Sequence, residues 1–104
     1  MNEADIKNIV ESHKLVLFAK GTAFQPMCGF SANAIHLVNQ LGKPFEVVNI
    51  FDDPECRPAL IAFSGWPTTP QLFVGGELIG GSDIIEEMMN SGDLQKKVAA
   101  AFAE

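Results

Sequence analysis

Residues 66–81, WPTTPQLFVGGELIGG, carry the clearest signal of the protein's architecture. Two short apolar runs flank Gly75 and Gly76, and a double glycine readily adopts the positive φ angles of a tight hairpin. The segment therefore predicts two strands joined at these glycines. A hairpin that follows alternating helices and strands is typical of a thin mixed sheet.

The segments on either side of the hairpin alternate between helix and strand. Apolar spacing predicts a helix over 5–12, a buried strand over 14–19, a helix over 30–41, a strand over 45–50, a helix up to 63 and a last helix over 94–102. Asp53 followed by Pro54 is typical of a helix N-cap with proline in the first helical position. Asp83 with Glu86 resembles a capping box that opens the helix after the hairpin. The order predicts an α/β protein, with a mixed sheet flanked by helices on both faces.

Length and charge exclude several classes of protein. A chain of 104 residues with 47% hydrophobic content predicts one domain over 1–104. The net charge of −6, without a cluster of Lys or Arg, argues against a nucleic-acid partner and an anionic membrane surface. The start, MNEADIKNIVESHKLVLFAKG, has early acidic residues, and its apolar run LVLFA is too short for a signal peptide or a membrane span. We expect a cytoplasmic protein with reduced thiols.

One of the two cysteines, Cys28, stands where a loop turns into a helix. The positive end of the helix dipole and the cation of Lys20 would both favour the thiolate there, and such settings lower a thiol pKa from about 8.5 to about 3.5–7.5. Gly29 leaves room for another sulfur or a metal. A buried structural cysteine is the alternative.

Three segments carry a resemblance to a known family: KGTAFQPMCGFS (20–31), WPTTPQLFVGGELIGG (66–81) and the overlapping GGSD (80–83). Together they resemble a monothiol glutaredoxin of the CGFS class, which has the thioredoxin-like fold with a four-stranded sheet. The resemblance covers the chain from about Ile6 to Leu94. A serine, Ser31, stands where dithiol enzymes carry the cysteine that expels a mixed disulfide, so resolution within the chain is not possible.

The resemblance implies two functions for Cys28. In the first, Cys28 is an iron ligand: two chains and two glutathione thiolates supply the four ligands of a bridging [2Fe–2S] cluster. The protein would then be a homodimer when cluster-bound, act in cluster transfer, assembly and iron homeostasis, and meet apo iron–sulfur proteins and a BolA-type partner. In the alternative, Cys28 is the catalytic residue of a glutathione-dependent oxidoreductase that removes glutathione from mixed disulfides. The sequence leaves open whether the protein is an enzyme.

The resemblance also assigns the glutathione site. Lys20 and Arg57 would take the glycine carboxylate, and the backbone of Thr69 would pair with the cysteinyl residue. Ser82 and Asp83 would hold the γ-glutamyl end, with Asp83 on its ammonium group and also as helix N-cap. In this fold the bond between Thr69 and Pro70 is expected to be cis, as only about 5–6% of X–Pro bonds are.

Three residues have more than one interpretation. Cys56 invites a disulfide with Cys28, but core packing is favoured because it would be the third residue of a helix opened by Asp53, where members of the resembling family commonly carry an aliphatic residue. Trp66 is either part of the active site or a structural anchor. Phe30 either packs beneath the loop or shields the cluster.

Overall fold

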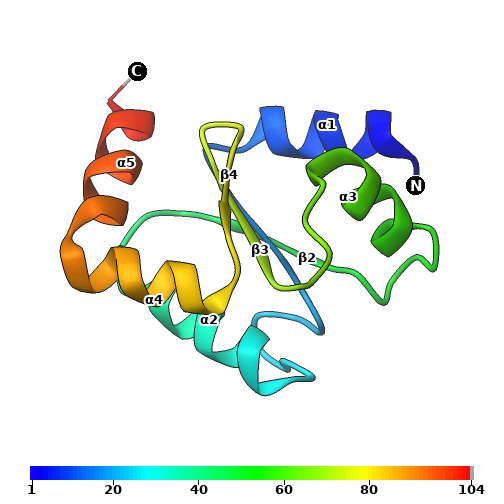
Figure 1. Cartoon of the computed structure of the whole chain (residues 1–104), viewed down its shortest axis with the longest axis horizontal. Helices are drawn as coiled ribbons and strands as arrows, with labels where there is room; N and C mark the ends of the chain where they lie inside the picture. Colours follow the sequence, from blue (N-terminus) through cyan, green and yellow to red (C-terminus); the bar gives the residue numbers. More distant parts are fainter. Residues whose placement is uncertain (104) are drawn as a thin grey trace.

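A four-stranded sheet lies between two layers of helices in the computed structural model, which describes residues 1–103 (Figure 1). The elements are α1 (Glu3–Ser12), β1 (Leu15–Ala19), α2 (Gly29–Asn39), β2 (Glu46–Asn49), α3 (Cys56–Ser64), β3 (Gln71–Val74), β4 (Glu77–Gly80), α4 (Ser82–Ser91) and α5 (Asp93–Phe102). Helices α1 and α3 cover one face of the sheet, and α2, α4 and α5 cover the other. The predicted α/β class and the mixed sheet with helices on both faces are confirmed.

The strands lie in the order β2, β1, β3, β4. Strand β1 pairs in parallel with β2 and antiparallel with β3, and β3 pairs antiparallel with β4. The turn between β3 and β4 has φ values of 58° at Gly75 and 85° at Gly76, in the left-handed region that glycine tolerates best. The hairpin predicted at these two glycines is therefore confirmed.

Strand β1 lies between two apolar clusters, and all five of its residues are buried. Leu15, Leu17 and Ala19 pack against α2 and the C-terminal helices, whereas Val16 and Phe18 pack toward α1 and α3. A strand covered on both faces has a continuous apolar sequence because both of its side-chain rows leave water. This buried strand ends at Ala19 and fixes the start of the loop that carries Cys28.

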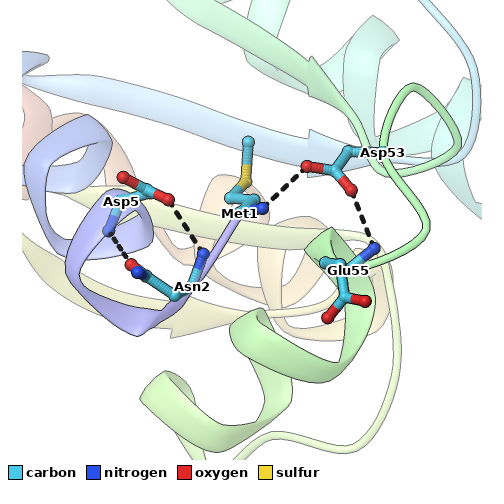
Figure 2. A network of polar contacts seen from close by, with 5 residues as sticks. All are labelled: Met1, Asn2, Asp5, Asp53 and Glu55. Carbon is cyan, nitrogen blue, oxygen red and sulfur yellow. Dashed lines mark hydrogen bonds and ion pairs between the residues drawn. The ribbon is translucent and has the colours of Figure 1, made fainter.

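The helices are 9 to 11 residues long, and within residues 1–103 none is long and apolar enough to cross a membrane. Helix α1 begins two residues earlier than predicted because Asn2 caps it. The Asn2 side chain accepts from the Asp5 N–H at 3.0 Å, and the Asp5 carboxylate accepts from the Asn2 N–H at 2.9 Å (Figure 2). This reciprocal pair satisfies two N–H groups at the helix start.

The prediction that Asp53 caps the third helix, with Pro54 in its first position, is wrong. Helix α3 begins at Cys56, and its N-cap is Glu55, which makes no side-chain cap. The Asp53 carboxylate instead accepts from the amine of Met1 at 2.8 Å and from the Glu55 N–H at 2.9 Å (Figure 2). These two bonds hold Asp53 in a turn before the helix, so its side chain does not face the first helical N–H groups.

The prediction that Asp83 caps the fourth helix, in a box with Glu86, is also wrong. Gly81 is the N-cap of α4, and Asp83 is the second residue inside the helix. Strand β4 runs to Gly80, so one extended residue, Gly81, is left between strand and helix. The helix therefore starts without a side-chain cap, and its first turn faces the groove described below.

Candidate functional site

Cys28 is the N-cap of helix α2, with φ −153° and ψ 154°. Its sulfur accepts a hydrogen bond from the Ser31 N–H at 3.3 Å, in the position that a serine or aspartate oxygen usually takes. The thiol therefore lies at the positive end of the α2 dipole, as the sequence predicts. The side chain is only partly buried, so the sulfur remains open to a reaction partner.

The hydroxyl of Ser31 is the second contact of the sulfur. Ser31 is fully buried, and its Oγ accepts from the Lys20 N–H at 3.0 Å and lies 3.3 Å from Cys28 Sγ. Because the amide of Lys20 donates to Ser31 Oγ, the hydroxyl hydrogen is free to point at the sulfur when the thiol has lost its proton. Ser31 thus links the end of β1 to the thiol.

These contacts determine the ionisation of Cys28. Burial raises the pKa of Cys28, but hydrogen bonds from the Ser31 hydroxyl and from the N–H groups of Ser31 and Phe30, with the charge of Lys20, bring the pKa below its ordinary value of 9.0. The direction agrees with the sequence prediction. The cause differs in part, because the Ser31 hydroxyl contributes more than Lys20.

A groove of about 460 Å³ opens beside the thiol helix. It is lined by Lys20, Phe30, Arg57, Trp66, Thr68, Thr69, Pro70, Gly81, Ser82, Asp83 and Ile84. The five residues predicted to bind a cofactor, Lys20, Arg57, Thr69, Ser82 and Asp83, all belong to this lining. Cys28 does not, and the groove reaches the thiol helix through Phe30. The roles of these residues as ligands remain predictions.

The charges in the groove come from separate elements. Lys20 follows β1 and Arg57 lies in the first turn of α3, and both cations line the groove. Asp83 comes with the uncapped N-terminus of α4. A ligand with two carboxylates and an ammonium matches this set of groups, because cations and a helix N-terminus bind carboxylates and a carboxylate binds an ammonium.

The loop before β3 forms the middle of the groove. The bond between Thr69 and Pro70 is cis, as predicted, and Thr69 is 8% exposed. Gln71, which sequence reasoning missed, is fully buried, and its Nε2 donates to the carbonyl oxygens of Trp66 and Thr68, each at 3.0 Å. A glutamine inside an apolar strand was the available signal, because a buried amide needs partners. Gln71 thus fixes the loop that presents Thr69.

The structure shows the surroundings of Trp66, Phe30 and Cys56, the three residues that the sequence left with two interpretations each. Trp66 is partly buried and lines the groove. Phe30 is 65% exposed, so it does not pack beneath the loop. Cys56 is fully buried as a free thiol in the cluster under α1 and α3, so the core-packing interpretation is confirmed.

Comparison with known proteins gives the family. The family model described as glutaredoxin matches residues 15–79. A protein of Rickettsia felis named monothiol glutaredoxin 2 is 50% identical over 91 residues, which cover 88% of each chain. The chain belongs to the glutaredoxin family. A monothiol glutaredoxin of Synechocystis, 43% identical over 101 residues, covers 97% of this chain and is itself covered to 94%.

Solved glutaredoxin structures confirm the thioredoxin-like fold. The solution structure of reduced apo GrxS14 from poplar has 43% identity and a TM-score of 0.85, with 98% of this chain and 94% of that chain covered. A crystal structure of a buckwheat glutaredoxin–glutathione complex has 27% identity and a TM-score of 0.85, with 97% and 90% covered. The pair Cys28 and Ser31 is in keeping with the monothiol relatives.

Proposed function

We propose that this glutaredoxin binds glutathione in the groove and, as a homodimer, carries a [2Fe–2S] cluster that it passes to apo iron–sulfur proteins in the cytoplasm. In this role it would serve cluster assembly and iron homeostasis, with a BolA-type protein as a further partner. The observation that carries the proposal is a thiol with a lowered pKa beside a groove lined by two cations, Lys20 and Arg57, and by the N-terminus of α4 with its carboxylate Asp83.

Glutathione fits the charges of the groove. Lys20 and Arg57 would bind its glycine carboxylate, because two cations hold an anion that water would otherwise solvate. The first turn of α4 would bind the γ-glutamyl carboxylate through uncapped N–H groups, with Asp83 on the ammonium. The backbone of Thr69 would pair with the cysteinyl residue as an added strand does. The glutathione sulfur would then lie near Cys28.

The donor set of one chain fits only a shared cluster. A [2Fe–2S] cluster takes four thiolates, and no group of three or more metal-binding side chains occurs within residues 1–103. Cys28 can supply one thiolate, so two chains and two glutathiones would complete the set. A Cβ placed on Gly29 would meet no atom within 4 Å, so there is space next to the sulfur. Half of the cluster's ligands would come from diffusible glutathione, which favours transfer of the cluster to a recipient protein.

The lowered pKa of Cys28 also supports a second candidate, a glutathione-dependent oxidoreductase. The Cys28 thiolate would attack the glutathione sulfur of a mixed disulfide, forming a bond between Cys28 and glutathione and releasing the substrate thiolate. A second glutathione thiolate would attack the bound glutathione sulfur, releasing oxidised glutathione and regenerating the Cys28 thiolate. Ser31 cannot replace that second thiol.

Anaerobic reconstitution with iron, sulfide and glutathione tests the proposal. Wild type should become a brown dimer with visible absorbance bands, and the same mixture without glutathione should not. Cys28→Ser should stay colourless, because it loses the protein ligand. Cys56→Ala is the matched control and should still form the cluster, since Cys56 is buried away from the groove.

The two candidates predict different active forms. The carrier requires the coloured dimer to transfer its cluster to an apo-ferredoxin. Rapid turnover of a glutathionylated peptide by the apo-monomer, without cluster formation under any of these conditions, would contradict the carrier and favour the enzyme.

A further inference from the structure

A hydrogen bond joins the thiol helix α2 to α4, the helix whose N-terminus lines the groove. Asn33 in α2 donates through Nδ2 to the Oγ of Ser82, the first residue of α4, at 2.8 Å. Ser82 is 6% exposed and lines the groove, whereas Asn33 lies behind it, outside the lining. Asn33 therefore acts on the groove only through Ser82.

The direction of this bond decides what Ser82 can offer. A serine hydroxyl has one hydrogen and two lone pairs. When Asn33 donates to Ser82 Oγ, one lone pair is used and the hydroxyl hydrogen is left over. The Ser82 hydroxyl lies at the N-terminus of α4, where the helix dipole and the first N–H groups also favour a negative group.

We propose that Asn33 is a positioning residue that makes the Ser82 hydroxyl a hydrogen-bond donor to the γ-glutamyl end of the ligand, namely to the free α-carboxylate of that residue. The inference rests on the proposed binding of glutathione and adds a source of specificity to it. Serine at position 82 alone does not suffice, because its hydroxyl could equally accept. The amide of Asn33 fixes it as the donor.

The chemistry of position 33 separates this role from simple packing. An aspartate there has nearly the same shape as asparagine but only accepts hydrogen bonds when ionised. In Asn33→Asp, the Ser82 hydroxyl would donate to the new carboxylate and no longer to the ligand. Asn33→Ala would remove the orientation of Ser82 but leave its hydrogen available, so it should weaken binding less.

The experiment is an NMR titration with two ligands that cannot exchange disulfides. One is S-methylglutathione, and the other is S-methylated 4-aminobutyryl-cysteinyl-glycine, which lacks only the γ-glutamyl α-carboxylate. Asn33→Asp should raise the Kd for the first ligand about tenfold or more and Asn33→Ala about two- to tenfold. Both variants should change the Kd for the second ligand less than about twofold. Asn39→Asp, with the same charge change on the exposed end of α2, is the matched control and should change neither.

A second comparison isolates the path through Ser82. In a Ser82→Ala background, Asn33→Ala should have no further effect on binding of S-methylglutathione, because the residue through which it acts is gone. Two outcomes would overturn this inference alone. In one, wild type binds S-methylglutathione and Asn33→Asp leaves the Kd unchanged; in the other, Asn33→Asp raises the Kd for both ligands equally. Absence of binding by wild type would overturn the proposed function and this inference with it.

Discussion

Cys28 and Cys56 both lie at the start of a helix, and yet their environments oppose each other. Cys28 is the N-cap of α2, and Cys56 is the first residue of α3. Burial raises the pKa of Cys28, but hydrogen bonds from Ser31 and the Phe30 N–H, together with the charge of Lys20, bring this pKa below 9.0. The pKa of Cys56 lies above 9.0, because burial and the carboxylate of Asp53 both disfavour its thiolate.

The difference shows that a helix N-terminus alone does not make a reactive thiol. Both cysteines lie near the positive end of a helix dipole, but their neighbouring side chains and N–H groups differ. Cys28 receives hydrogen bonds at its sulfur from Ser31 and remains partly exposed, but Cys56 is 0% exposed within an apolar cluster. Hydrogen bonds to the charged sulfur and access for a partner therefore decide which cysteine is functional.

Alkylation at neutral pH should give the largest contrast between the two cysteines. We expect one iodoacetamide label on the native wild type, one on Cys56→Ala and none on Cys28→Ser. The Cys28 thiol should react about a hundredfold faster than Cys56, because it is both ionised and accessible. Mass spectrometry at timed intervals measures both rates. Equal labelling rates of the two cysteines in the folded protein would contradict the claim that Cys28 is the reactive thiol.

Ser31→Ala tests whether the hydroxyl is what distinguishes the Cys28 site. Removing a hydrogen bond to the charged sulfur should raise the pKa of Cys28 toward its ordinary value, and it leaves the Lys20 N–H without its acceptor. The thiolate's ultraviolet absorbance against pH measures the change. Ser91→Ala, on the exposed end of α4, is the control and should give the wild-type curve. An unchanged pKa in Ser31→Ala would show that the dipole suffices.

The two cysteines should contribute to stability with opposite pH dependence. The folded pKa of Cys28 is below the unfolded value of 9.0, so its stabilising contribution is present above 9.0 and lost as pH falls through the folded pKa. For Cys56 the folded pKa is above 9.0, so stability falls as pH rises above 9.0. The free energy of unfolding can be measured with urea between about pH 6 and pH 10. Cys28→Ala should lose the increase in this free energy as pH rises toward 9.0, and Cys56→Ala should lose the decrease above 9.0. The same profile in both variants would contradict the contrast.

The smallest effect on the thiol is expected from Lys20→Met. Lys20 contributes less to the Cys28 pKa than the Ser31 hydrogen bonds do, so its loss should raise this pKa less than Ser31→Ala does. Binding of S-methylglutathione should weaken by about tenfold, because a groove cation is lost. A larger change of the Cys28 pKa in Lys20→Met than in Ser31→Ala would show that Lys20, and not Ser31, is the main group that lowers this pKa.

The sequence predicted the elements of the fold because apolar period and glycine position are local signals. The buried run over β1 and the turn at Gly75 and Gly76 follow directly from them. The two caps at Asp53 and Asp83 could not be predicted in this way. Which carboxylate faces a helix start depends on distant partners, such as the Met1 amine for Asp53, and on where the preceding strand ends.

The same limit applies to the site. The sequence predicted Cys28 at a helix start, and the family resemblance predicted the five other residues that line one groove. It treated Ser31 only as a missing cysteine, because the bond from the Lys20 N–H joins β1 to α2 across 11 residues. Asn33 and Gln71 were missed for a related reason: their partners are a hydroxyl 49 residues away and the carbonyls of a loop.

The most direct test of the central claim is native mass spectrometry of the anaerobically reconstituted protein. We expect one species with two chains, one [2Fe–2S] cluster and two glutathiones, which Cys28→Ser does not form and Cys56→Ala does. A cluster held by a single chain, or a dimer that keeps its cluster without glutathione, would contradict the claim that the Cys28 thiolate shares its cargo with glutathione.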